Sequence, residues 1–255
     1  MTDTALSRRR FLQFSGLAMA SGLAGCTSSM NTEVFREQTR PYFRNTALEG
    51  IEHDGGTITA VRTNRGTIAT DTVICAAGAW SAQVGELAGV DLPVTPVRRQ
   101  ILTTGPVADL APDIPFTIDF ATSFYFHGEG RGLLLGMSDP DETPGFKLQM
   151  SDAWLPRLGE VIERRAPRIA EFGIGSGWAG LYEVTPDHNG LVGEADGVSR
   201  FLYATGFSGH GFLMGPAIGE VMRDLYLGRE PVIDVTSLDA RRFADGDARP
   251  ELNIV

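Results

Sequence analysis

The sequence predicts a mixed α/β fold, and three observations carry that prediction. Residues 200–228 have the pattern of a short apolar strand, a glycine-rich turn and a helix. Several short β-like runs are separated by turn signals, among them Asp54-Gly55-Gly56. Residues 152–165 carry apolar side chains at helical spacing. The 255 residues are enough for one large domain or two modest ones.

Composition limits the classes of partner and site. Apolar residues make up 42% of the chain and charged residues 21%, as in an ordinary soluble globular protein. A formal net charge of -10 argues against nucleic acid as a partner. The two cysteines, Cys26 and Cys75, are too few for a cysteine-rich metal cluster or a disulfide framework. Cys75 lies in an apolar run and is expected to be a small buried hydrophobic residue.

The first 26 residues have the pattern of an export signal. An arginine-rich start, Ser7-Arg8-Arg9-Arg10-Phe11-Leu12, precedes a short apolar stretch that ends in small residues. The paired arginines resemble a twin-arginine (Tat) signal, and Leu23-Ala24-Gly25-Cys26 resembles a lipobox, in which cleavage leaves Cys26 lipidated. Residues 27–44 are then a tether, and the chain is expected to be exported and held at the membrane only through the lipid. The alternative is a basic amphipathic leader on a cytoplasmic protein.

The body of the chain is expected to alternate short strands with a few helices. Predicted strands cover residues 47–51, 57–63, 67–70, 72–77, 94–104, 123–126, 132–137 and 177–184. One helix is expected from Ser81, as its N-cap, to residue 87. A second helix over residues 152–165 is ended by Pro167 and flanks a mixed sheet.

The glycine-rich stretch after the last predicted strand is the first candidate site. Gly206, Gly209 and Gly211 let bare backbone approach a ligand. Pro216 suits an early position of a helix that starts at about Gly215, and Gly228 ends that helix. A helix N-terminus offers free N–H groups and a partial positive charge, which favour an anion or a polarised carbonyl. The alternative is a tight turn that binds nothing.

Four motifs occur in one order over about residues 45–243. They are the run from Thr63 to Ser81 that contains Ala76-Ala77-Gly78-Ala79-Trp80, then Leu92 to Gln100, then Trp178 to Asp187, and finally Gly206 to Gly219. Together they resemble the D-amino-acid oxidase-like FAD-dependent oxidoreductases, which include sarcosine, dimethylglycine and glycine oxidases and dehydrogenases. The resemblance implies a partial, glutathione-reductase-like FAD-binding domain over residues 45–90 and 182–243. It also implies an inserted mixed-sheet substrate domain over residues 91–181 and a tail over 244–255.

One family element does not occur at the start of this chain. Family members open with a strand, GxGxxG and a helix that hold the FAD pyrophosphate. The literal match Gly175-Ser176-Gly177-Trp178-Ala179-Gly180 is followed by a β-like run instead of a helix, so we reject it as a pyrophosphate site. The resemblance therefore covers the C-terminal part of the family. A truncated gene, a partner chain that supplies the missing half, and a chain that does not bind FAD as its relatives do all remain open.

The resemblance also implies roles for particular residues. Cofactor contacts fall on two segments, which comprise Ala77, Gly78 and Trp80, and then Gly206, Ser208, Gly209, His210, Gly211, Phe212 and Leu213. His210, Tyr125 and Tyr182 are catalytic candidates, although a turn hydrogen bond or simple packing would also explain them. Arg98 and Arg99 are candidates for substrate binding, and because they are adjacent on a strand only one can face the cavity.

The implied activity is oxidation of a secondary amine or amino acid, with a sarcosine-like compound as the favoured substrate. A hydride equivalent passes from the C–H beside nitrogen to flavin N5, and the imine product hydrolyses. Glycine-oxidase-like relatives have a carboxylate-binding arginine where this chain has Tyr182. Asp139, Asp141 and Glu142 lack regular cation-ligand spacing, so we expect a solvated acidic loop and no metal site. The alternative function is a non-catalytic fragment that needs a partner or acts as a binding or structural remnant.

Overall fold

A computed structural model describes residues 43–111 and 113–252. Contacts divide the chain into residues 1–45 and 46–255, and all the described helices and strands belong to the second unit. The predicted export signal, Cys26 and nearly all of the predicted tether lie outside the described residues. The mixed α/β class is confirmed, with three sheets and helices packed between and around them. The finer division of residues 46–255 into a flavin domain, a substrate domain and a tail stays a prediction.

The first sheet consists of three antiparallel strands joined by tight turns. Its strands are β1 (Leu48–Asp54), β2 (Thr57–Thr63) and β3 (Gly66–Ala69). Gly55 and Gly56 have φ angles of 54° and 84°, so the predicted hairpin turn uses a backbone conformation that glycine adopts without strain. Ile51 and Ile58 point from this sheet into the largest core cluster.

The second sheet has the order β10 (Leu191–Glu194), β11 (Phe201–Thr205) and β4 (Val73–Cys75). β11 is antiparallel to β10 and parallel to β4. The helix α4 (Gly211–Tyr226) buries Val221 and Met222 against one face of this sheet, while Tyr203 packs into the main core on the other. Cys75 is buried as predicted, and burial raises the pKa of its thiol.

The run 72–77 forms a shorter and more open strand than its apolar composition suggested. β4 contains only three residues, and its Ile74 side chain is partly exposed. The chain then turns at Gly78 through the 3-10 helix η3 (Gly78–Trp80) into α2 (Ser81–Glu86). The predicted extent of α2 is confirmed, but the expected capping role of Ser81 is wrong. Ser81 is the first residue of α2, and its hydroxyl bonds to another segment instead.

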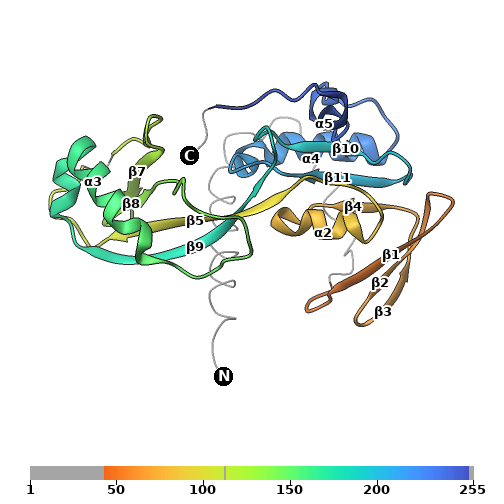
Figure 1. The fold of residues 1–255 in the computed structure, drawn as a ribbon, viewed down its shortest axis with the longest axis horizontal. Helices are drawn as coiled ribbons and strands as arrows, with labels where there is room; N and C mark the ends of the chain where they lie inside the picture. The colour runs from red at the N-terminus through yellow and green to blue at the C-terminus, as the bar shows by residue number, and fades with distance from the viewer. Residues whose placement is uncertain (1–42, 112, 253–255) are drawn as a thin grey trace, which may run out of the picture. The chain divides into compact units, whose positions relative to one another are not determined.

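The third sheet has five strands and is antiparallel throughout. Its order is β6 (Thr117–Asp119), β7 (Phe124–Glu129), β8 (Gly132–Gly136), β5 (Thr95–Thr104) and β9 (Ile174–Val184). The mixed sheet expected for this part is thus corrected: β7 and β8 are joined by a two-residue turn, whereas a parallel pair would need a long crossover. In Figure 1, α3 (Leu155–Arg165) lies with β7 and β8 beside one end of β5 and β9.

The helix α3 forms as its pattern predicts. Trp154, Leu158, Val161 and Ile162 are buried against the sheet, and Ser151 caps the preceding 3-10 turn η4 (Asp152–Trp154). The remaining short helices are η5 (Pro167–Glu171), η6 (Thr236–Leu238) and α5 (Arg242–Asp245).

The glycine triplet between residues 175 and 180 lies inside β9, which confirms that it is not a nucleotide-binding turn. Over the described part of the chain, every helix is too short or too polar to span a lipid bilayer.

Candidate functional site

The turn after β4 and the turn after β11 lie next to each other, although about 125 residues of sequence separate them. The Thr205 hydroxyl, at the end of β11, donates a hydrogen bond of 2.6 Å to the Ser81 hydroxyl. Glu183 of β9 joins both turns, because its carboxylate accepts a bond of 3.2 Å from the Phe207 N–H and lies against the Cα of Gly78. Burial raises the pKa of Glu183. The structure thus brings together the two segments that the sequence predicted to contact a cofactor.

The turn after β11 adopts a backbone that few side chains tolerate. Gly206, Ser208 and Gly209 have φ angles of 73°, 51° and 104°. The cost at Ser208, which is buried, is offset by a hydrogen bond of 3.2 Å from its hydroxyl to the Gly206 carbonyl. The turn then reverses the chain so that α4 begins at Gly211.

The start of α4 lies four residues earlier than predicted. His210 is the N-cap residue, so Pro216 is inside the helix and not near its first turn. The expected end is confirmed, because Gly228 follows the helix with a φ of 64°. The early start leaves Phe212 and Leu213 in the first turn, where 72% and 85% of their surface is exposed.

The N-terminus of α4 is the part of this region best suited to a ligand. The first N–H groups of a helix have no intrahelical partner, and the helix dipole adds partial positive charge there. The His210 carbonyl accepts a bond of 3.2 Å from the Leu213 N–H, while the His210 imidazole makes no capping hydrogen bond. The site can therefore stabilise negative charge on a group placed against α4.

Tyr182 connects this loop to the five-stranded sheet. A Cβ atom on Gly209 would lie 2.5 to 2.9 Å from the Cε2, Cζ and hydroxyl oxygen of Tyr182, so this side chain packs directly on that glycine. The Arg99 guanidinium carbon lies 5.2 Å from the centre of the same ring. Gly209, Tyr182 and Arg99 therefore form a row of contacts that extends from the turn before α4 to β5.

Tyr125 lies on the same side of the sheet. Its ring covers Gly136, where an added Cβ would approach the Tyr125 Cζ to 2.2 Å. Burial raises the pKa of Tyr125 to about 12 and also raises the pKa of Tyr182. Both phenols are therefore protonated at neutral pH and can donate hydrogen bonds.

The two neighbouring arginines of β5 point in different directions, as their adjacent strand positions predicted. Arg98 binds Glu142 at 2.6 Å and the Gln149 carbonyl at 2.8 Å. Glu142 also binds Lys147 at 2.8 Å, and only 3% of its side chain is exposed. The expected solvated acidic loop is thus wrong for Glu142, because two cations bury it. No cluster of three or more metal-ligating side chains occurs among the residues that the structure describes.

The Gly78 turn is bordered by exposed apolar side chains. Trp80 and Phe146 contact each other with ring centroids 5.3 Å apart, and both rings are partly exposed. Ile74 of β4 is also partly exposed. Ala77 immediately precedes the positive-φ residue Gly78, which leads into η3. Exposed apolar surface of this kind suits a flat, aromatic group.

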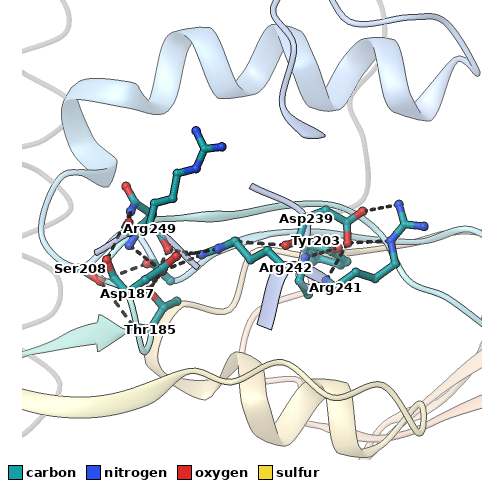
Figure 2. A network of polar contacts seen from close by, with 11 residues as sticks. Thr185, Asp187, Tyr203, Ser208, Asp239, Arg241, Arg242 and Arg249 are labelled. Atoms are coloured by element: carbon teal, nitrogen blue, oxygen red, sulfur yellow. Dashed lines mark hydrogen bonds and ion pairs between the residues drawn. The ribbon is translucent and has the colours of Figure 1, made fainter. Parts of the chain in front are cut away.

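A buried ion pair behind the loop was not predicted. Arg242 donates hydrogen bonds of 2.8 and 2.9 Å to the Asp187 carboxylate, and both side chains are almost fully buried. Figure 2 shows Thr185 and Ser208 beside Asp187. Burial alone would raise the pKa of Asp187, but the bonds from Arg242 hold it below its usual range. No local pattern links positions 55 residues apart, so the sequence offered no signal for this pair.

The C-terminal segment joins the same group of contacts. The Glu251 N–H donates to the Asp187 carbonyl at 2.9 Å, and the Asn189 amide donates to the Arg249 carbonyl at 2.7 Å. A Cβ on Gly206 would lie 2.4 Å from the Thr185 methyl group, so the Thr185–Asn189 turn packs on the glycine loop. The ion pair therefore fixes the segment on which the candidate site is built.

Residues 32–225 match the family model of DAO, the FAD dependent oxidoreductases. The chain belongs to the DAO family. It is 31% identical to the hydrogen cyanide synthase subunit HcnC of Pseudomonas protegens, over 86% of this chain and 52% of that protein. It is also 31% identical to glycine oxidase of Pseudomonas aeruginosa, over 74% of this chain and 50% of that protein.

The crystal structure of L-proline dehydrogenase from P. horikoshii has the same fold over most of this DAO-family chain. The TM-score is 0.72 with 28% identity, over 81% of this chain and 55% of that one. The chain spans about half the length of these relatives. FAD is the cofactor of the family, and the open N-terminus of α4 and the exposed apolar side chains at the Gly78 turn are both features that suit a flavin ring.

Proposed function

We propose that this chain forms the flavin-facing and substrate-facing part of an FAD-dependent oxidoreductase that oxidises a secondary amine or an amino acid. The observation that carries the proposal is the meeting of the Gly78 turn, the glycine loop before α4 and the Tyr182 ring at one place. The names of the relatives support the substrate class, because glycine is an amino acid and proline is a cyclic secondary amine.

The chain's own residues would hold the cofactor from two sides. The backbone of Gly206 to Gly211 and the first turn of α4 would contact the polar edge of the flavin, where the helix N-terminus stabilises negative charge. Ala77, Gly78 and Trp80 would border the ring from the β4 side. When bound, FAD supplies the electron acceptor for the hydride equivalent that leaves the carbon beside the substrate nitrogen.

The substrate would lie against the face of the five-stranded sheet that carries Tyr125 and Tyr182. Both phenols keep their protons at neutral pH and can orient a substrate carboxylate or hold a water molecule. His210 stands at the edge of the same loop and is the candidate for contact with the substrate or the flavin. A sarcosine-like N-methyl amino acid is the substrate that we favour.

We also propose a complementing polypeptide for the ADP-binding half of the cofactor. The support for a second chain is the name of one relative, HcnC, which is a subunit of hydrogen cyanide synthase. Export by the Tat route with a lipid on Cys26 is part of the same proposal and would place the enzyme at a membrane surface. A Cys26→Ala variant that still fractionates with membranes would contradict the lipid anchor.

The direct test is uptake of FAD by the purified chain, followed by desalting and a visible absorbance spectrum. We expect the flavin band to stay with the protein. A Leu213→Glu variant should lose it, because it places a carboxylate where the flavin edge would bind, while an acidic residue in the first helical turn favours folding. Val232→Glu is the matched control, since Val232 is similarly exposed but lies beyond the end of α4. A folded wild-type chain that takes up no added FAD would show that this chain alone is not an oxidoreductase, and would favour either a complementing chain or a non-catalytic role.

A further inference from the structure

Arg99 is a partly buried cation without an anion. Its Nε atom is buried and has no hydrogen-bond partner, and one terminal nitrogen donates only to the Arg98 carbonyl at 3.2 Å. Across the described residues, no carboxylate lies within 4.0 Å of its guanidinium nitrogens. Burial lowers the pKa of Arg99. A buried charge without a counter-charge is costly, so this residue is expected to have a partner that the folded chain itself does not provide.

The acidic groups nearest to Arg99 are engaged elsewhere. Glu142 bridges Arg98 and Lys147 at 2.6 and 2.8 Å. The Asp139 carboxylate accepts the Asp141 N–H at 3.1 Å. The charges of both carboxylates act to raise the pKa of Arg99, but only through space and without contact. Neither carboxylate therefore serves as the counter-ion of Arg99.

Hydrogen-bond donors and open space surround the same guanidinium. Arg99 lies over the Tyr182 ring, and Tyr125 is close enough to interact with it electrostatically. Arg99 also lines a cavity of about 1020 Å³ together with Val97, Val184 and Ser138. A planar, forked guanidinium beside protonated phenols is the donor set that suits a carboxylate.

We propose that Arg99 binds the carboxylate of the substrate, an inference that rests on the proposed function for the identity of the ligand. The adjacent Arg98 is excluded from this role because Glu142 and the Gln149 carbonyl occupy it. Tyr182 stands between Arg99 and Gly209, so a carboxylate on Arg99 lies on the side of the sheet that faces the glycine loop. The carboxylate-binding arginine of this chain therefore lies on β5. In glycine-oxidase-like relatives the corresponding arginine is expected at the position of Tyr182, on β9. The substrate class is then an amine that bears a free carboxylate.

The test compares propionate with propionamide, which have the same shape but differ in charge. Ligand-observed NMR on the full chain should show that wild type binds propionate about tenfold or more tightly than propionamide. Arg99→Gln should remove this preference. Arg157→Gln should keep it, because Arg157 lines the same cavity but is exposed and pairs with Asp141. Equal binding of the two ligands by wild type, or a preference that survives in Arg99→Gln, would overturn the inference.

This experiment separates the carboxylate site from the flavin site, because its signal needs no cofactor. A chain that takes up FAD but shows no preference for propionate overturns the role of Arg99 and leaves the proposed function standing. A chain that prefers propionate but takes up no FAD supports the anion site and contradicts flavin binding by this chain alone. Equal binding of the two ligands by wild type overturns the inference even if Arg99→Gln does not fold.

Discussion

Two partly or fully buried arginines of this chain have opposite surroundings. Arg242 is 5% exposed and donates to both oxygens of Asp187 and to the Asn189 carbonyl. Among the described residues, the buried Nε of Arg99 has no hydrogen-bond partner, and its guanidinium contacts only the Arg98 carbonyl and the Tyr182 ring. The contrast between Arg242 and Arg99 shows that burial of a charged side chain does not by itself indicate whether it has a structural or a ligand-binding role. The fully partnered Arg242 fixes the scaffold, whereas we propose that the unpartnered Arg99, beside a cavity, binds a ligand.

The largest loss of stability is expected when the ion pair between Arg242 and Asp187 is removed. Arg242→Met leaves the Asp187 carboxylate buried without a cation, which should lower the free energy of unfolding by about 3–5 kcal/mol. Urea denaturation followed by fluorescence measures this loss. Arg241→Met is the control, because Arg241 forms its ion pairs at the surface and should cost less than about 1 kcal/mol. Similar losses in the two variants would contradict the scaffold role of Arg242.

The next largest loss of stability is expected at Gly209, on which the Tyr182 ring packs. Gly209→Ala adds a Cβ at a φ of 104° and within 2.5 Å of the Tyr182 ring, so it should cost about 2–3 kcal/mol and displace the ring. Gly215→Ala is the matched control, since Gly215 lies in α4 with open space around it. There the extra methyl should stabilise the helix by about 0.5–1 kcal/mol. Thermal and urea unfolding of both variants tests the contact, and equal stabilities would refute it.

A smaller effect is expected where Glu142 joins Arg98 and Lys147. Burial alone would raise the pKa of Glu142, but hydrogen bonds from the two cations outweigh it and hold the pKa below its usual value. Glu142→Gln should therefore cost about 1–2 kcal/mol at pH 7. Because the pKa is lower in the folded state, this stabilisation is present above about pH 4.3 and is lost as the pH falls through the folded-state pKa. Urea curves at a series of pH values should show the wild type and the variant converging as the pH falls through the folded-state pKa of Glu142. A constant difference would contradict this account.

Much of the fold could be predicted from local patterns. Hydrophobic periodicity, together with the glycine and proline residues that end helices and strands, predicts strand β2, the helix α3 and the end of α4 at Gly228. The start of α4 was misplaced because Pro216 suggested a first turn, whereas the preceding backbone already turns at Gly206 and Gly209. Local patterns describe neighbours in sequence, and such a turn is stabilised by contacts with β9.

The candidate site was predictable only in part. The two glycine-containing segments could be chosen from motifs, and the alternation of Arg98 and Arg99 could be deduced from the strand. The partners of these arginines could not, because Glu142 lies 44 residues away from Arg98 in the sequence. The pairing of Asp187 with Arg242 was hidden for the same reason. Long-range ion pairs depend on the packed fold and leave no local signature.

The most direct test of the contrast between the two arginines is the urea unfolding curve of Arg99→Met, measured beside wild type and Arg242→Met in one buffer. We expect Arg99→Met to keep the unfolding free energy of wild type within about 0.5 kcal/mol, or to raise it, because it removes a partly buried charge that has no counter-charge among the described residues. The unfolding free energy of Arg242→Met should fall by several times that amount. A loss in Arg99→Met as large as that in Arg242→Met would show that Arg99 belongs to the scaffold and would contradict its assignment to a ligand.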